Sequence, residues 1–311
     1  MWFNLFSREL QPFNEGYLPT KDGHTVYFRQ FGNPDGIPVL SFHGGPGGSS
    51  RTKYAKLFNL KKYRIIQYDQ RGCGQSLSEN YLYKNETEYL LHDAEILLTH
   101  LDIKKKIIIQ GVSWGSTLAL LFAEKYPAMV QKIIVSSVFL ARSEDEAWIS
   151  HDSQRFYPDL WTQMKMKLKL NNNNNVYDQY IKMLFSSDEK QYLTALSYLG
   201  SYEYMLGQLA PQFIEQSSCL PEELQSSRIY FHYQQNNFFM KENQILRQAE
   251  IIKNIPTLIV HNRMDFCCPV KQAWDLHLAL PQSVIKIASG YGHSNPKLLK
   301  ILKNAMNTFL M

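Results

Sequence analysis

Cysteine is scarce in this sequence, with 4 in 311 residues. The four are Cys73, Cys219, Cys267 and Cys268, and no spacing among them matches a structural zinc site. The adjacent residues Cys267 and Cys268 are poorly placed to form a disulfide with each other. Such cysteines look like reduced thiols, and they predict a cytoplasmic protein.

Long apolar runs and blocks of like charge are also missing. No uninterrupted apolar stretch is long enough to span a bilayer, and residues 1–8 lack the pattern of a signal peptide. The 33 Lys and Arg exceed the 28 Asp and Glu by 33 − 28 = 5, a small excess that forms no basic block. We therefore expect neither a membrane nor a nucleic acid as partner. The sequence also implies no metal or organic cofactor.

The order of the predicted elements indicates an α/β fold. Strands alternate with helices, and the clearest helical spacing covers residues 86–101. This alternation implies a mostly parallel central sheet with helices on both faces. The predicted strands cover residues 24–31, 39–42, 63–69, 107–110, 133–138, 256–262 and 283–288.

Strand signals fade between about residues 140 and 245. This part is polar, aromatic and helical, and it contains an asparagine run at 171–175 that we interpret as a surface loop or linker. We interpret residues 140–245 as a helical lid inserted into the core fold. The core is then made of two parts, residues 1–139 and 246–311.

The most informative stretch is 107–120, in which a β-branched run is followed by Gly-Val-Ser-Trp-Gly and a helix-forming segment. Strand, tight turn and helix in this order predict a nucleophile elbow with Ser113 exposed at its tip. Larger side chains at Gly111 and Gly115 would collide with the neighbouring helix and strand. The helix N-terminus favours negative charge developing beside Ser113.

A glycine-rich run, His-Gly-Gly-Pro-Gly-Gly, occupies residues 43–48 directly after a predicted strand. Its backbone N–H groups can supply half of an oxyanion hole, and the N–H of Trp114 can supply the other half. A flexible connection is an alternative. A phosphate-binding loop is another, although no Gly-Lys-Ser or Gly-Lys-Thr follows.

Ser113 needs a base and an acid that orients this base. Asp265 and His293 each lie in a loop just after a predicted strand, and the chain order Ser, Asp, His is the one expected of α/β-hydrolases. A turn-forming role remains the alternative for Asp265. Asp69 and Arg71 more naturally shape their own loop beside the site. The histidines that compete for the base role are His43, His92, His232, His261 and His277.

At this point the sequence resembles the prolyl aminopeptidases, also called proline iminopeptidases. The resemblance rests on residues 43–48, on Asp-Gln-Arg-Gly-Cys-Gly-Gln-Ser at 69–76, and on Gly-Val-Ser-Trp-Gly-Ser-Thr-Leu-Ala-Leu at 111–120. It extends to residues 260–265 and 290–294, and so covers almost the whole chain. It implies a serine exopeptidase that releases N-terminal proline from short peptides, with the N–H groups of Gly45 and Trp114 as oxyanion donors.

The helical segment departs from the family pattern. The resemblance implies that Glu203 binds the free amino group of the substrate and that Phe139 lines the proline pocket. The family's second glutamate is replaced by Tyr230, and a further pocket aromatic by Gln234. A nearby acid can compensate, and the candidates are Glu144, Asp145 and Glu146, which otherwise resemble an exposed charged helix start.

Three functions remain open from the sequence. The first is a peptidase for short peptides with N-terminal proline and a free amino terminus. The second is a hydrolase of the same fold that cleaves other small amides or esters, with Tyr230 and Gln234 reshaping the pocket. The third is a non-catalytic binding protein that has kept the fold. The oligomeric state cannot be derived from the sequence.

Overall fold

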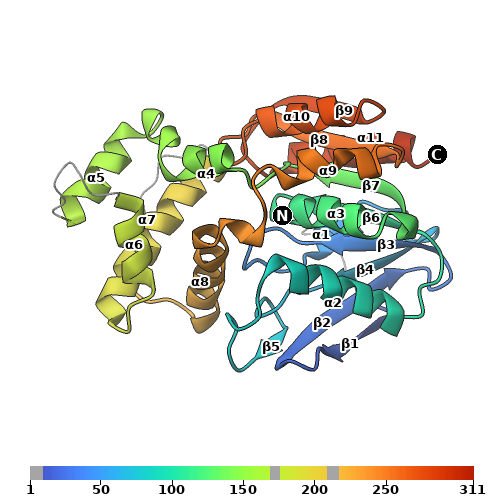
Figure 1. Ribbon diagram of the computed structural model, residues 1–311, viewed down its shortest axis with the longest axis horizontal. Coiled ribbons are helices and arrows are strands. Elements are labelled where there is room, and N and C mark those ends of the chain that lie inside the picture. The colour runs from blue at the N-terminus through green and yellow to red at the C-terminus, as the bar shows by residue number, and fades with distance from the viewer. Residues whose placement is uncertain (1–9, 169–175, 209–216) are drawn as a thin grey trace, which may run out of the picture.

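The computed structural model describes residues 10–168, 176–208 and 217–311. The predicted asparagine linker at 171–175 lies outside these residues. A layered α/β part and a helical part lie side by side in Figure 1. Within the described residues, no helix is both long and apolar enough to cross a membrane.

The central sheet has the strand order β1-β2-β4-β3-β6-β7-β8-β9, and the short β5 pairs with β2. From β4 to β9 every neighbouring pair is parallel, whereas β2 is antiparallel to β1, β4 and β5. The prediction of a mostly parallel sheet is therefore confirmed. The strands are β1 (Asn14–Pro19), β2 (His24–Gly32), β3 (Ile37–Phe42), β4 (Tyr63–Tyr68), β5 (Leu77–Ser78), β6 (Ile107–Val112), β7 (Val130–Ser136), β8 (Thr257–Met264) and β9 (Val284–Tyr291).

Helices cover both faces of the sheet, and each face has its own apolar core. The larger core packs α2, α3, α9 and α10 on one face, whereas α1 and α11 cover the other. The strand β6 is buried along its whole length, as expected for a strand sandwiched between two helical layers. These helices are α1 (Thr52–Ala55), α2 (Thr87–His100), α3 (Trp114–Lys125), α9 (Gln244–Ile252), α10 (Lys271–Ala279) and α11 (Pro296–Phe309).

The chain between β7 and α9 contains the helical part, and no strand occurs in its described residues. Aromatic rings form much of its interior: Trp161 lies 5.4 Å from Tyr202 and Tyr177 lies 5.7 Å from Phe231, between ring centroids. Figure 1 shows α8 as the element of this part that runs beside the sheet. Its helices are α4 (Ser143–Ser150), α5 (Pro158–Leu168), α6 (Val176–Leu184), α7 (Glu189–Gln208) and α8 (Pro221–Gln235).

Candidate active site

Ser113 lies at the turn between β6 and α3, in a backbone conformation that side chains rarely adopt (φ 57°, ψ −129°). The two flanking glycines explain how this turn is possible. A Cβ atom at Gly111 would lie 2.0 Å from the carbonyl oxygen of Gly115, and one at Gly115 would lie 2.2 Å from the carbonyl oxygen of Phe42 in β3. Only glycine fits at either position, so the strained turn holds Ser113 at the end of the sheet.

His293 and Asp265 form a hydrogen-bonded pair, with 2.8 Å between His293 Nδ1 and Asp265 Oδ2. The other carboxylate oxygen of Asp265 accepts hydrogen bonds from the backbone N–H groups of Cys267 (3.0 Å) and Cys268 (2.9 Å). Asp265 therefore orients the imidazole and also shapes its own turn, so that the two roles considered for it coexist.

Electrostatics reinforce this pair. Burial alone would raise the pKa of Asp265, but attraction to His293 and the hydrogen bonds hold it below its usual value. Burial would lower the pKa of His293, but the carboxylate of Asp265, with a smaller contribution from Cys267, raises it to about 10. The site thus stabilises an imidazolium, as a base that accepts a proton from a serine requires.

The loop that carries His293 is fixed by polar contacts on the core side. The hydroxyl of Ser137, which follows β7, donates to the His293 carbonyl at 2.6 Å. The side-chain amide of Asn262 in β8 donates to the Gly292 carbonyl at 2.8 Å. The backbone that carries the imidazole is thus held by β8 and by the residue that follows β7.

A cavity of about 420 Å³ joins these residues to the helical part. Gly45, Ser113, His293, Glu203 and Tyr230 all line it, and Asp265 lies behind His293. Its volume is at the small end of the range for ligand pockets. The structure therefore brings five of the sequence-predicted site residues to one pocket.

The glycine-rich loop borders the same cavity and is packed tightly. Gly45 has φ 139°, and a Cβ there would lie 2.7 Å from the backbone nitrogens of Gly47 and Gly48. Gly47 has φ 86°, and a Cβ there would lie 2.2 Å from the carbonyl oxygen of Ser226 in α8. The Ser226 hydroxyl also donates to the Gly47 carbonyl at 2.7 Å. The loop thus has a fixed shape, which favours an oxyanion hole over a flexible connection.

One side chain connects this loop to the elbow. The amide nitrogen of Gln70 donates to the His43 carbonyl at 3.0 Å, and its oxygen accepts from the indole N–H of Trp114 at 3.1 Å. The Trp114 side chain is therefore buried in the core. Its backbone N–H, at the first residue of α3, is the group predicted to donate to the oxyanion. The ring of His43 accepts from the Gln70 N–H at 2.9 Å, which assigns this histidine to holding the loop.

Two predicted substrate residues do not line this cavity. Phe139 is 5% exposed, and its ring packs edge-on against Phe238 at 5.1 Å. Gln234 lies at a second cavity, of about 410 Å³, where its amide donates to Glu146. Neither side chain is among the residues that line the cavity containing Ser113 and His293.

Glu146 is half-buried, whereas the sequence suggested an exposed, charged helix start. The sequence alone did not distinguish it from Glu144 and Asp145. Burial raises its pKa to about 7. Burial also raises the pKa of Glu203 to about 8, and the charge of Glu146 contributes to that shift. Among the described residues, Glu146 Oε2 and Glu203 Oε1 are buried without a hydrogen-bond partner. Burial therefore favours the protonated form of both carboxyl groups in the absence of substrate, and Glu203 is the one of the two that lines the cavity with Ser113.

Among the described residues, none of the competing histidines lines the cavity that contains Ser113 and His293. His261 is fully buried, and its Nδ1 accepts from the Val138 N–H at 3.0 Å. His232 contacts the Asn85 carbonyl and His277 contacts the Ser283 hydroxyl, at 3.1 and 2.7 Å. His92 lies on the surface beside Glu95.

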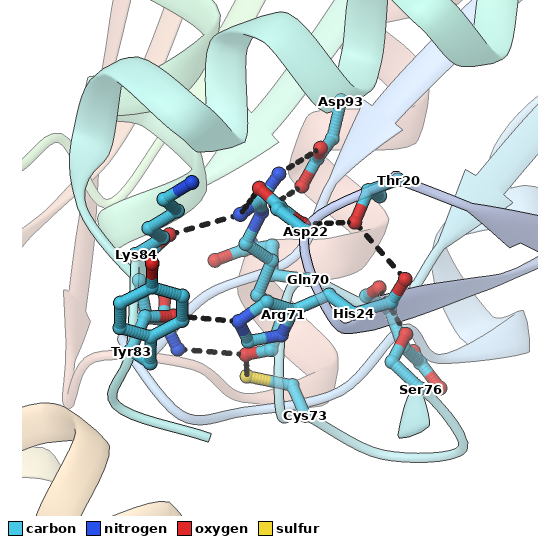
Figure 2. A network of polar contacts seen from close by, with 12 residues as sticks. Thr20, Asp22, His24, Gln70, Arg71, Cys73, Ser76, Tyr83, Lys84 and Asp93 are labelled. Atoms are coloured by element: carbon cyan, nitrogen blue, oxygen red, sulfur yellow. Dashed lines mark hydrogen bonds and ion pairs between the residues drawn. The ribbon is translucent and has the colours of Figure 1, made fainter. Parts of the chain in front are cut away.

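Asp69 and Arg71 have structural contacts. Asp69 accepts from the backbone N–H groups of Ser50 and Gln75, at 2.7 and 2.9 Å. Figure 2 shows Arg71 between Asp22 and Asp93, with ion-pair distances of 2.7 and 2.6 Å. These contacts fix the loop after β4, as the sequence suggested.

Comparison with known proteins places these observations in a wider group. The family model of the α/β-hydrolase fold matches residues 37–296. Proteins named proline iminopeptidase are similar to almost the whole chain. The one from Xylella fastidiosa (strain Temecula1) is 35% identical over 97% of this chain and 98% of its own length. The one from Neisseria gonorrhoeae is 33% identical over 96% and 97%.

Solved structures agree on the fold. A hydrolase from Pseudomonas aeruginosa has a TM-score of 0.65 at 15% identity, covering 96% of this chain and 98% of the other. A proline iminopeptidase-related protein from Thermus thermophilus has a TM-score of 0.61 at 16% identity, covering 95% and 98%. At this identity the structural likeness shows the α/β-hydrolase fold alone.

Proposed function

Because this chain belongs to the proline iminopeptidase family of α/β-hydrolases, we propose that it is a serine exopeptidase releasing N-terminal proline from short peptides. The observation that carries the proposal is that Ser113 and His293 line one cavity together, with Asp265 bonded to Nδ1 of the imidazole. The substrate is a small peptide with a free amino terminus.

In the proposed mechanism, Ser113 Oγ attacks the carbonyl carbon of the N-terminal residue while His293 accepts the hydroxyl proton. Asp265 stabilises the resulting imidazolium. The N–H groups of Gly45 and Trp114 donate to the oxyanion. His293 then returns the proton to the leaving amine, and water hydrolyses the acyl-enzyme by the same steps.

The substrate's ammonium group is assigned to Glu203, with Glu146 as a second source of negative charge. Two facts support this: Glu203 lines the cavity, and the charge of Glu146 acts on it. Tyr230 lies on the cavity wall where the family has its second glutamate. Phe139 and Gln234 are proposed to shape the proline subsite from behind this wall.

The helical part, with boundaries near residues 140 and 245, is proposed to act as a lid over the core formed by 1–139 and 246–311. The contact of Ser226 in α8 with Gly47 supports a covering role. We also propose a cytoplasmic location, supported by the four free cysteines, and a function without nucleic-acid partners.

A second candidate is a hydrolase of other small amides or esters. The observation that favours it is the tyrosine at position 230, which leaves the cavity wall with one carboxylate where the family pattern has two. This candidate shares the nucleophile and base and differs only in the group that is recognised.

A substrate panel separates the two candidates: the naphthylamides of proline, alanine and acetylproline, and a nitrophenyl ester. The proposed peptidase cleaves the free prolyl amide and spares the acetylated one. Equal rates on both would show that the amine is not recognised and would favour the second candidate. If no substrate turns over and a serine-directed phosphonate fails to label Ser113, the protein is a non-catalytic binder.

A further inference from the structure

Two cysteines and the predicted catalytic histidine form a cluster that their sequence spacing did not reveal. One potential ligand atom from each of Cys267, Cys268 and His293 lies within 4.8 Å of the other two. Both cysteines are free thiols. They follow β8, whereas His293 follows β9, and the pairing of these two parallel strands brings the two loops together.

The cluster is accessible from one side and enclosed on the other. Cys267 and His293 line the catalytic cavity, and the His293 side chain is 17% exposed. Cys268 is only 2% exposed, so it would contribute its sulfur from the protein interior. Cys267 and His293 are therefore open to an ion in the cavity, whereas Cys268 does not line it and lies next to them on the buried side.

The groups behind the cluster are arranged as they are behind metal-binding histidines. Such a histidine commonly donates one ring N–H to a carboxylate and binds the metal through its other nitrogen. Here His293 Nδ1 is bonded to Asp265 at 2.8 Å, which leaves Nε2 as its ligand atom. The same carboxylate also accepts from the backbone N–H groups of both cysteines, so one residue orients all three ligands.

We propose that Cys267, Cys268 and His293 form an inhibitory binding site for a borderline-soft divalent cation, with Zn²⁺ as the best match. Thiolate and neutral imidazole are the preferred zinc ligands, and a water from the cavity completes the tetrahedron. Two sulfurs on one tetrahedral zinc lie about 3.8 Å apart at ordinary bond lengths. The ligand atoms of this cluster all lie within 4.8 Å of one another before any ion is bound. Binding releases the two thiol protons to solvent, and no oxidation or reduction occurs.

Occupation of this site would stop the proposed hydrolysis. The lone pair of His293 Nε2 that accepts the Ser113 proton is the one that would bind the metal. One nitrogen cannot do both, so metal and catalysis exclude each other. This inhibition rests on the proposed function, whereas metal binding itself does not.

The first experiment measures binding without reference to activity. Co²⁺ is titrated into the reduced protein, and the thiolate-to-cobalt absorption band is followed. We expect one Co²⁺ per chain, displacement by Zn²⁺, and loss of the band in Cys267→Ser and Cys268→Ser. Cys219→Ser is the matched control, because Cys219 is a free thiol outside the cluster, and it should bind as the wild type does. Asp265→Asn should weaken binding by roughly 10- to 100-fold.

The second experiment measures inhibition in a metal-buffered assay, with each variant normalised to its own rate without zinc. Zn²⁺ should inhibit the wild type reversibly, and Cys267→Ser should need at least tenfold more zinc. Absence of the cobalt band in the wild type, or equal zinc inhibition of wild type and Cys267→Ser, would overturn the proposal. A cobalt band in a protein that hydrolyses no substrate would contradict the proposed function and leave the metal site supported.

Discussion

The backbone N–H of His293 donates a hydrogen bond to the carbonyl oxygen of Gly207, 2.7 Å away. Gly207 lies in the last turn of α7, four residues after Glu203, so both face the same side of that helix. This contact thus ties the loop of the predicted base to the helix that carries the predicted amine-binding carboxylate. Catalysis and recognition depend on the same packing of α7 against the loop after β9.

Glu203→Gln should raise KM for a free prolyl amide and leave KM for a nitrophenyl ester nearly unchanged. A hydrogen bond to a charged group is worth about 1.5–3 kcal/mol, which is roughly a 10- to 100-fold increase in KM. Glu146→Gln should act in the same direction with a smaller effect. Glu144→Gln is the control, because its side chain is 55% exposed on the same helix as Glu146. An unchanged ratio of the two KM values would remove Glu203 from the site.

The pKa of His293 should fall when its carboxylate partner is neutralised. In the folded protein it is raised to about 10, against burial, mainly by Asp265. Asp265→Asn removes the charge that favours the imidazolium, so the neutral base forms at lower pH. The measurement is an NMR titration of ¹⁵N-labelled histidine in wild type and variant. If the pKa of His293 is the same in both proteins, Asp265 does not stabilise the imidazolium, and its predicted role is wrong.

The raised pKa of His293 also predicts how the rate of hydrolysis depends on pH. His293 acts as a base only when neutral, so kcat/KM for an uncharged ester should rise with pH through the alkaline range. For the prolyl amide, Glu203 must also lose a proton, and its pKa of about 8 adds a second rise. Profiles of kcat/KM for both substrates, in wild type and Glu203→Gln, test this. The variant should lose the rise near pH 8 with the amide alone.

Gly47→Ala should destabilise the protein by on the order of 2 kcal/mol or more, because the new Cβ would overlap the Ser226 carbonyl of α8. Gly200→Ala is the matched control within a helix. A Cβ there meets no atom within 4 Å, and alanine favours a helix over glycine by about 0.5–1 kcal/mol. Thermal unfolding should show opposite shifts in Tm for the two variants. Equal shifts would mean that α8 does not press on the loop.

Glu124 in α3 predicts a pH-dependent stability. It is 6% exposed, neither carboxylate oxygen has a hydrogen-bond partner among the described residues, and burial raises its pKa to about 8. A raised folded pKa means that stability is greatest below the unfolded value of 4.5 and decreases as pH rises toward 8. Glu124→Gln should therefore raise Tm more at pH 9 than at pH 5. A Tm difference that is the same at both values would contradict this.

Much of the fold was predictable because the central strands carry local signals. The run before Ser113 is buried on both faces of the sheet, and its uninterrupted β-branched residues indicate this directly. In contrast, β1 was not predicted, because it is an edge strand whose residues are mostly exposed and lack a clear apolar alternation. Its antiparallel pairing depends on β2 rather than on its own sequence.

The site, too, was predictable only where the residues lie next to a strand with a clear local signal. Ser113, Asp265 and His293 could be chosen because each follows a recognisable strand, whose end fixes its position on the sheet. The contact of Gln234 with Glu146 joins residues 88 positions apart, and nothing local in either helix indicates it. Likewise, His293 joins Cys267 and Cys268 as a third potential metal ligand only because β8 pairs with β9. Such relations arise from tertiary packing.

The bridge made by Gln70 has a consequence for how the enzyme admits its substrate. One planar amide joins the His43 carbonyl, at the start of the glycine-rich loop, to the Trp114 indole at the elbow, so the two segments that carry the predicted oxyanion donors are tied together by a spacer within the core. Neither end of that spacer belongs to the helical part. Motion of the helical part can therefore change which peptides enter and how fast products leave, while the two segments that carry the predicted oxyanion donors stay joined.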